Sequence, residues 1–202
     1  MQDYSSYKIG VLALQGAVTE HLQQIAQLGA RGVAVKKTSQ LSELDALILP
    51  GGESTAIGHL MRQCGFIEAI RDFSSQQKPI LGTCAGMILL AKELAGAEQP
   101  HLQLMDIRVQ RNAFGRQVES FQVDLKIKGL IDSFPAIFIR APIIEKVNLS
   151  TEQKSEVEVL AEFNGNVVLA KQKNLVACSF HPELTDNTAV MRLFLDLIKK
   201  SN

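Results

Sequence analysis

The sequence predicts a three-layer α/β domain with a mostly parallel central sheet and antiparallel strands added in the second half. Two observations predict this fold. Between residues 7 and 95, short apolar runs alternate with helix-like segments, which is typical of parallel strands buried on both faces and covered by helices. In the second half, strand-like runs follow one another, and Asn164-Gly165 between two of them is a strong hairpin signal.

In the first half of the chain, we expect strands to alternate with helices. Apolar residues in segment 17–28 recur every three or four positions, so that they form one face of a helix. Glycine-containing turns follow three of the strands, and ligands in such sheets bind beyond the carboxyl ends of the strands. The predicted strands are 7–14, 33–36, 46–49 and 79–81, and the predicted helices are 17–28, 55–63, 66–76 and 85–95.

The second half is expected to be richer in strands and to end in a helix. Segment 150–156 is polar and is predicted to be a surface loop. Because no repeat, low-complexity segment or linker divides the chain, we expect one domain over residues 1–202. The predicted strands are 118–127, 136–139, 157–163, 167–171 and 175–180, and the closing helix is 187–200.

Composition excludes several classes of function. Lys+Arg and Asp+Glu both number 21, so the zero net charge does not favour nucleic acid or an anionic membrane. The sequence has neither the ~20-residue apolar run of a membrane span nor the apolar core of a signal peptide. We therefore expect a cytoplasmic protein. The three cysteines are widely spaced and odd in number, which favours neither disulfides nor a zinc site.

The stretch Gly82-Thr-Cys-Ala-Gly86 follows a predicted strand and opens a predicted helix. This is the context of a nucleophile elbow, in which the flanking glycines permit a sharp turn and close packing. The turn would place Cys84 at the positive end of the helix, which favours a thiolate. The N–H group of Ala85 would face a developing oxyanion. The alternative is a buried structural cysteine, since free cysteines are often buried.

A second segment, Cys178-Ser-Phe-His-Pro-Glu183, offers a base for that thiol. Pro182 biases His181 toward an extended conformation, in which residues i and i+2 project to the same side. Glu183 would then hold the ring of His181, as the third member of a nucleophile–base–orienter triad does. The alternative is a strand-end turn with a solvated glutamate.

The remaining cysteines and histidines are expected to be structural or surface residues. Cys178 lies inside an apolar strand, and Cys64 precedes a glycine at a predicted helix end. His21 and His59 lie in helix-like segments, and His101 lies in a polar stretch. Separately, the Pro-Gly-Gly-Glu turn at 50–53 could orient backbone amides toward an anion, although an ordinary β-turn would have the same sequence.

Taken together, these segments resemble the class I (triad) glutamine amidotransferases, which have a flavodoxin-like fold. More narrowly, the chain resembles the family of glutaminase subunits of pyridoxal 5′-phosphate synthase, from about Lys8 to its closing helix. GTCAG and SFHPE are general to the wider group, whereas the narrower match rests on GVLALQGAVTEH (10–21), LPGGEST (49–55), RNAFGRQVESF (111–121) and FIRAP (138–142). Residues 1–7 form an N-terminal extension without an assigned role.

The resemblance implies a catalytic triad. Cys84 would attack the side-chain carboxamide of glutamine, His181 would transfer the proton, and Glu183 would orient His181. Gly52 and Ala85 would supply the N–H groups of the oxyanion hole. No metal or organic cofactor is implied.

The resemblance also implies contacts with substrate and partner. The expected partner is a synthase subunit that uses the released ammonia to build pyridoxal 5′-phosphate from a pentose phosphate and a triose phosphate, within a hetero-oligomer. The implied substrate residues are Gly51, Gly52, Glu53, Arg111, Ile139 and Arg140, and the implied partner contacts are Gln15 and Gly16.

Three alternatives stay open on the sequence. One is a glutaminase serving another synthase, such as one of histidine or purine biosynthesis. Another is a cysteine peptidase or γ-glutamyl hydrolase with the same nucleophile and base. The last is a non-catalytic regulatory subunit, which would have no need of the complete Cys84, His181 and Glu183 set.

Overall fold

The computed structural model describes residues 3–96, 99–113, 120–149 and 156–198. This part of the chain forms a ten-stranded mixed sheet, in the order β2-β1-β3-β4-β12-β11-β9-β6-β5 with β10 beside β11, and a separate β7-β8 hairpin. The predicted fold class is confirmed. The strands are β1 (Lys8–Leu12), β2 (Arg31–Val35), β3 (Ala46–Leu49), β4 (Ile80–Thr83), β5 (Ala91–Leu94), β6 (Met105–Gln110), β7 (Ser120–Leu125), β8 (Phe134–Ile139), β9 (Ile143–Val147), β10 (Glu158–Phe163), β11 (Asn166–Gln172) and β12 (Leu175–Cys178).

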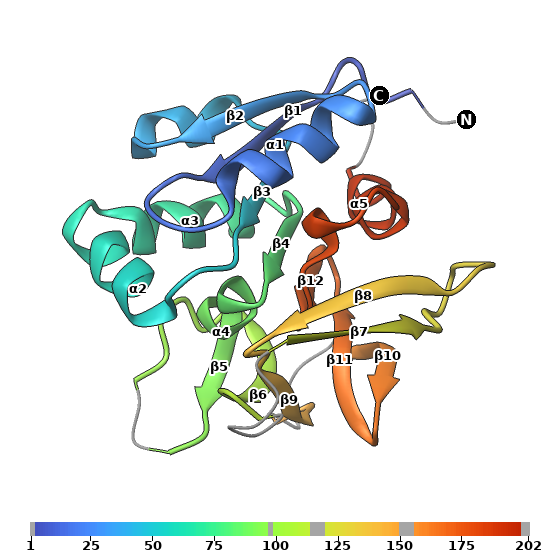
Figure 1. Cartoon of the computed structure of the whole chain (residues 1–202). Coiled ribbons are helices and arrows are strands. Elements are labelled where there is room, and N and C mark those ends of the chain that lie inside the picture. The colour runs from blue at the N-terminus through green and yellow to red at the C-terminus, as the bar shows by residue number, and fades with distance from the viewer. Residues whose placement is uncertain (1–2, 97–98, 114–119, 150–155, 199–202) are drawn as a thin grey trace.

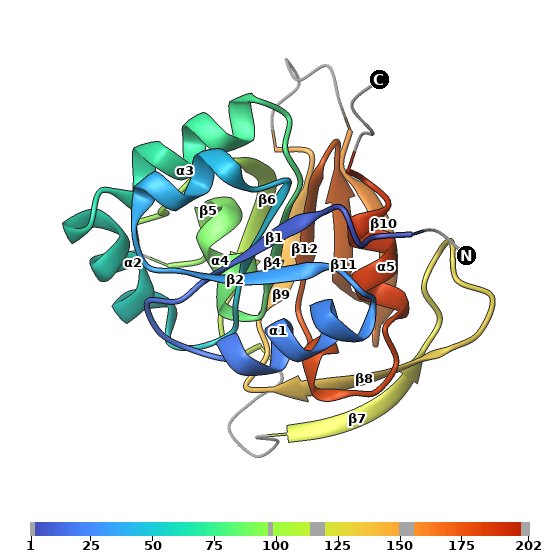
Figure 2. The same ribbon diagram turned by 90° about the horizontal axis from the view of Figure 1, so that it is seen from above.

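Helices cover both faces of the sheet, as Figures 1 and 2 show. Helices α1 and α5 lie on one side, together with the β7-β8 hairpin, and α2, α3 and α4 lie on the other. The α-helices are α1 (Val18–Gln27), α2 (Ser54–Gln63), α3 (Phe66–Ser75), α4 (Ala85–Leu90) and α5 (Ala189–Leu195), and the 3-10 turns are η1 (Thr38–Glu43) and η2 (Pro182–Leu184).

The strands hold these layers together through the alternation of their side chains. Along β3, Leu47 and Leu49 pack into the core beneath α2, α3 and α4, whereas Ile48 packs into the core beneath α1 and α5. All three side chains are completely buried. Because successive residues of a strand point to opposite faces, one short apolar strand joins two cores.

The parallel strands bring three turns to one edge of the sheet. β4 lies between β3 and β12, with Gly82 beside Leu49 and Thr83 beside Cys178 in register. The turns that follow these strands therefore meet. The Cys84 N–H donates to the Cys178 carbonyl at 2.8 Å, which fastens the turn after β4 to the end of β12.

Close backbone packing fixes the crossing of β4 and α4. A Cβ added at Gly86 would overlap the carbonyl oxygen of Leu49 and lie 2.8 Å from its carbonyl carbon. A Cβ added at Gly82 would overlap the backbone of Gly86. Glycine is needed at both positions because the obstacle is main chain rather than a flexible side chain.

The structure corrects several predicted elements. The predicted helix 85–95 ends at Leu90, and Ala91 adopts an extended conformation to begin β5, which pairs with β6. Pairing within the sheet thus overrides the helical propensity of Ala91-Lys-Glu-Leu94. Strands β6 and β9 were not predicted, and α5 is shorter than the predicted helix 187–200. Residues 118–119, 150–155 and 199–200 of the predicted elements lie outside the described residues.

Residues near the start of the described chain pack against the sheet and α5. Tyr4 and Tyr7 are both buried. The Tyr4 hydroxyl donates to the Asp196 carboxylate at 2.7 Å, just beyond α5. This segment therefore contributes to the core beside α1 and α5.

We expect Gly86→Ala to destabilise the protein by about 1–3 kcal/mol, because the added methyl group meets the fixed main chain of Leu49. Helix propensity acts in the opposite direction, by about 1 kcal/mol in favour of alanine. Urea unfolding measures the change. His59→Ala on the exposed face of α2 is the control and should stay within about 0.5 kcal/mol; equal stability of both variants would show that the close approach is unimportant.

Candidate active site

Cys84 lies between β4 and α4 in a strained backbone conformation. Its φ is +48° and its ψ is −103°, a combination that costs a non-glycine residue about 1–3 kcal/mol. The residue is 8% exposed, and its sulfur lies 3.9 Å from the Ile139 carbonyl oxygen. This geometry is the predicted elbow: the turn presents the sulfur at the sheet edge instead of burying it in the core.

His181 and Glu183 meet as predicted, although by a different local structure. Nδ1 of His181 lies 2.7 Å from Oε1 of Glu183. The segment is not extended past His181, because Pro182 begins the 3-10 turn η2. That turn carries the carboxylate to the ring, and the His181 N–H donates to the Ile137 carbonyl on β8 at 2.8 Å. The Glu183 carboxylate thus holds the ring, and β8 holds the main chain that carries it.

The charges of this buried group favour an ionised pair. Burial lowers the pKa of His181, but hydrogen bonds to Cys84 and Glu183, together with their negative charges, outweigh burial and raise this pKa to about 10. Burial acts to raise the pKa of Glu183, and the two histidine rings beside it lower that pKa by more. Glu183 is therefore a carboxylate that supports an imidazolium at His181.

The turn after β3 passes directly beside these two side chains. A Cβ added at Gly51 would lie 2.5 Å from Cε1 of His181 and 3.5 Å from Cβ of Cys84. Only a glycine lets the main chain approach both so closely. The turn between Gly51 and Glu53 is therefore part of the same site.

Gln15 and the residues after it hold that turn in place. The Gln15 side-chain oxygen accepts from the Glu53 N–H at 2.9 Å. The Ala17 N–H donates to the Gly51 carbonyl at 3.0 Å. The loop after β1, which contains Gly16, thus packs against the 51–53 turn.

Glu53 caps α2 and carries negative charge at the rim of the site. Its carboxylate accepts from the N–H groups of Thr55 at 2.9 Å and Ala56 at 2.7 Å. The Thr55 N–H, together with the Ala56 N–H and the charge of Arg111, lowers the pKa of Glu53. Nη2 of Arg111 lies 3.3 Å from Oε1 of Glu53.

A cavity of about 390 Å³ opens in front of the thiol. This volume lies within the ~300–1,000 Å³ range of small-molecule sites. Ser54, which sequence reasoning missed, also lines it; its hydroxyl is buried without a hydrogen-bond partner in the described structure. Ile139 is 37% exposed. The predicted residues that line the cavity are Gly52, Glu53, Cys84, Ala85, Arg111, Ile139, Arg140 and His181.

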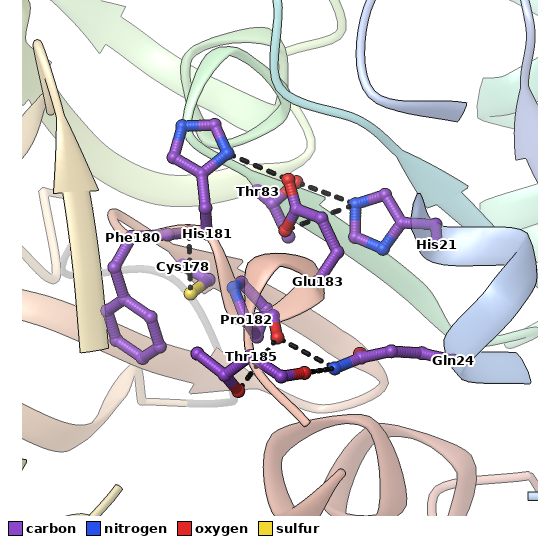
Figure 3. Close-up of polar contacts among 9 residues, drawn as sticks. All are labelled: His21, Gln24, Thr83, Cys178, Phe180, His181, Pro182, Glu183 and Thr185. Atoms are coloured by element: carbon purple, nitrogen blue, oxygen red, sulfur yellow. Dashed lines mark hydrogen bonds and ion pairs between the residues drawn. The ribbon is translucent and has the colours of Figure 1, made fainter. Parts of the chain in front are cut away.

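His21 is the second residue whose contact with the site sequence reasoning missed. It is completely buried, so it is one of the structural residues that the sequence allowed, and Nε2 of its ring lies 3.5 Å from Oε2 of Glu183 (Figure 3). A signal for this was present. His21 stands three residues after Val18 and four before Ile25, which places it on the apolar face of α1.

The other cysteines and histidines stay outside this group. Cys178 is completely buried, and its thiol donates to the Phe180 carbonyl at 3.3 Å, so its prediction as a core residue is confirmed. Cys64 is the C-cap of α2, at the predicted helix end, and it is exposed. His59 is exposed on α2, and His101 contacts Arg62.

Among the described residues, no group of three or more His, Cys, Asp or Glu side chains could hold a metal ion. None of the helices in this part of the chain has both the length and the apolar composition needed to cross a membrane.

Comparison with known proteins decides the family. The model of the SNO glutamine amidotransferase family matches residues 11–200. This chain belongs to that family.

Individual relatives match nearly the whole chain. The pyridoxal 5′-phosphate synthase subunit PdxT of Actinobacillus pleuropneumoniae serotype 5b (strain L20) is 61% identical over 200 residues, 99% of this chain and 100% of that protein. The protein of the same name from Pasteurella multocida (strain Pm70) is 62% identical over 98% of this chain and 100% of its own length. A crystal structure of a glutamine amidotransferase superposes with a TM-score of 0.86 at 46% identity, covering 94% of this chain and 98% of that one.

The predicted family and enzyme class are therefore confirmed. The chain is a glutamine amidotransferase. The roles of individual site residues stay predictions, although the structure brings Cys84, His181 and Glu183 together.

We expect the pKa of His181 to fall in a Cys84→Ala variant and in a Glu183→Gln variant. Each change removes a hydrogen bond and a negative charge that raise this pKa toward about 10, and leaves the burial that lowers it. NMR titration of ¹⁵N-labelled histidine measures the midpoint. Cys64→Ala is the control, because that thiol is exposed and lies outside the site. A midpoint unchanged in both site variants would contradict the ionised pair.

Proposed function

We propose that this chain hydrolyses L-glutamine to L-glutamate and ammonia, as the glutaminase subunit of a pyridoxal 5′-phosphate synthase. The observation that carries the proposal is the Cys84–His181–Glu183 array, which lies beside a cavity in a member of the glutamine amidotransferase family. The names of the relatives support the pyridoxal 5′-phosphate pathway, and the geometry of the site supports hydrolysis by a cysteine nucleophile.

The proposed reaction begins with the thiolate of Cys84. The sulfur attacks the carboxamide carbon, the C=O pair moves onto oxygen, and a tetrahedral oxyanion forms. The N–H groups of Gly52 and Ala85 are proposed to donate to this oxyanion, and losing one such donor typically costs about 3 kcal/mol of barrier. The oxyanion then collapses, the C–N bond breaks, and protonated His181 gives its proton to the leaving nitrogen. The products are ammonia and a glutamyl thioester.

Hydrolysis of the thioester completes the proposed cycle. His181, now neutral, takes a proton from water as the water oxygen attacks the thioester carbon. The C–S bond breaks, glutamate leaves, and the thiolate and imidazolium are restored. Glu183 stays ionised throughout and keeps Nδ1 of His181 protonated, so that Nε2 is the atom that exchanges protons. This cycle needs no metal or organic cofactor.

The rim of the cavity suits the two charges at the other end of glutamine. Arg111 and Arg140 are proposed to attract the α-carboxylate, and Glu53 the α-ammonium group. Gly51, Gly52 and Ile139 are proposed to complete the wall around the side chain. Charge complementarity of this kind orients a small zwitterion without holding its carboxamide.

The proposed partner is a synthase subunit, and the ammonia would pass to it within a cytoplasmic hetero-oligomer. Gln15 and Gly16 are proposed to meet that partner. Support comes from their position, because the loop that carries them packs against the 51–53 turn next to the thiol. The synthase would use the ammonia, a pentose phosphate and a triose phosphate to make pyridoxal 5′-phosphate.

The alternatives receive less support. Full-length relatives at about 60% identity are named as pyridoxal 5′-phosphate synthase subunits, which favours that pathway over other synthases. A γ-glutamyl hydrolase or a peptidase would need room for a longer substrate. A purely regulatory subunit would not require a thiol, an imidazole and a carboxylate in contact.

We expect Cys84→Ala and His181→Asn to reduce glutamine hydrolysis by roughly 10⁴-fold or more, and Glu183→Gln to leave more activity, since the orienter of a triad contributes less than its nucleophile. Ammonia release by the chain with its synthase subunit measures this. Cys64→Ala should match the wild type, and Cys178→Ser should affect stability more than turnover. An active Cys84→Ala protein would refute the proposal.

We also expect ammonia release to be weak for the isolated chain and strongly stimulated by a pyridoxal phosphate synthase subunit. The physical reason is that the 51–53 turn depends on its contacts with Gln15 and Ala17, which a partner at that loop would alter. Strong activity that does not depend on the synthase subunit would support the proposed cysteine chemistry but contradict the proposed pathway. Release of amines from γ-glutamyl peptides, with none of ammonia from glutamine, would favour the hydrolase.

A further inference from the structure

One face of α1 packs against η2, the turn that carries Glu183. His21 lies on this face and is completely buried. Its Nε2 is 3.1 Å from Oγ1 of Thr83 and 3.5 Å from Oε2 of Glu183. Figure 3 shows the ring aimed at the carboxylate from the side opposite His181.

The carboxylate of Glu183 needs a donor at this position. Its Oε1 is taken by His181 at 2.7 Å. Oε2 is buried without a hydrogen-bond partner in the described structure, and Nε2 of His21 faces it at 3.5 Å. A buried carboxylate oxygen that has lost its water is costly unless a donor faces it. His21 is the group placed to supply that donor.

The surroundings of His21 select its tautomer. With the proton on Nε2, the ring donates to Oγ1 of Thr83 at 3.1 Å and turns the same N–H toward the Glu183 carboxylate. Of the ring atoms, only Nδ1 then lacks a partner in the described structure, and it carries a lone pair. With the proton on Nδ1, a buried N–H would have no acceptor there, and the Nε2 lone pair would face a carboxylate. The first arrangement is the more stable one.

A neutral His21 ring also leaves the negative charge of Glu183 available to stabilise the imidazolium of His181. Burial lowers the pKa of His21, and the attraction of Glu183 offsets this only in part. A neutral N–H orients Glu183 without cancelling its charge. A second imidazolium would instead compete with His181 for the same carboxylate.

Gln24, one turn further along α1, supports the same turn at its main chain. Its side-chain nitrogen donates to the Pro182 carbonyl at 2.7 Å and to the Thr185 carbonyl at 2.9 Å. Gln24 is also buried. Residues three apart on a helix share a face, so one face of α1 holds both the backbone of η2 and the Glu183 side chain.

We infer that His21 is a positioning residue of the reaction: its Nε2–H fixes Oε2 of Glu183, and Glu183 in turn fixes the ring of His181. The inference rests on the proposed function, because it requires His181 to act as the base. His21 lies behind Glu183, does not line the cavity, and is not expected to touch substrate.

The experiment compares His21→Gln with His21→Asn in the chain complexed with its synthase subunit. Both variants place a polar amide in the same buried space. The glutamine amide reaches about as far as Nε2 of histidine, whereas the asparagine amide stops near Nδ1. His59→Asn is the matched control on an exposed position. Circular dichroism establishes the temperature at which all variants are folded, and kcat and KM for glutamine are measured there.

We expect His21→Asn to lose about ten- to a hundredfold in kcat, the range for partners that orient a catalytic ligand, with KM close to the wild-type value. His21→Gln should recover most of the loss. In a Glu183→Gln background, His21→Asn should cause no further loss, because groups that act as one unit are not additive.

Two results would overturn the inference. One is an equal activity of the glutamine and asparagine variants, whether high or low, since packing alone would affect both alike. The other is an undiminished effect of His21→Asn in the Glu183→Gln background. In either case, the proposed function still stands if the wild-type complex hydrolyses glutamine and Cys84→Ala does not. An inactive wild-type complex would contradict the proposed function itself.

Discussion

The site depends on one constraint, the strained backbone of Cys84 at the crossing of β4 and α4. A φ of +48° is unfavourable for cysteine, and neighbouring main chain keeps it there. The Cys178 carbonyl holds the Cys84 N–H at 2.8 Å, and the Gly86 backbone is packed against Leu49 so closely that no side chain fits. Because β3, β4 and β12 are adjacent parallel strands, the same packing that forces the turn also brings the 51–53 turn and His181 to the sulfur.

The second requirement is a buried charge arrangement that stays fixed. Glu183 is 5% exposed and His181 8% exposed, so water screens their attraction little. Such a pair is favourable only when its remaining polar atoms are satisfied. The proposed donor on α1 meets this need at Oε2 of Glu183. The Ile137 carbonyl on β8 accepts from the main-chain N–H of His181 and so fixes the backbone that carries the ring. The base is thus located by elements from both halves of the chain.

The part of this site that the sequence predicts best is the part that depends on turn-forming residues close together in the chain. Glycines around Cys84 mark a turn at a strand end, and parallel strands bring such ends together. Pro182 predicted an extended segment, but the structure has the 3-10 turn η2 there, and this turn brings Glu183 to the ring of His181. Residues Ala91–Leu94 show where this reasoning fails. Their sequence predicts a helix, and pairing with β6 makes them a strand instead. Ser54 and His21 show the same limit for the site. Their importance comes from what packs beside them, and neither stands in a turn motif. The helical period places His21 on the buried face of α1. Its neighbours in the sequence do not indicate that it lies beside Glu183.

Helix α1 connects the two halves of the site. Just before it begins, Gln15 and Ala17 hold the 51–53 turn through the Glu53 N–H and the Gly51 carbonyl. Within it, His21 and Gln24 hold the turn of the base. A small shift of this helix or of its leading loop therefore changes the proposed oxyanion donors and the orientation of His181 together. Packed elements of this kind move between discrete arrangements rather than deforming continuously. A partner bound at Gln15 and Gly16 would thus act on both halves of the reaction through one helix, without reaching the cavity itself.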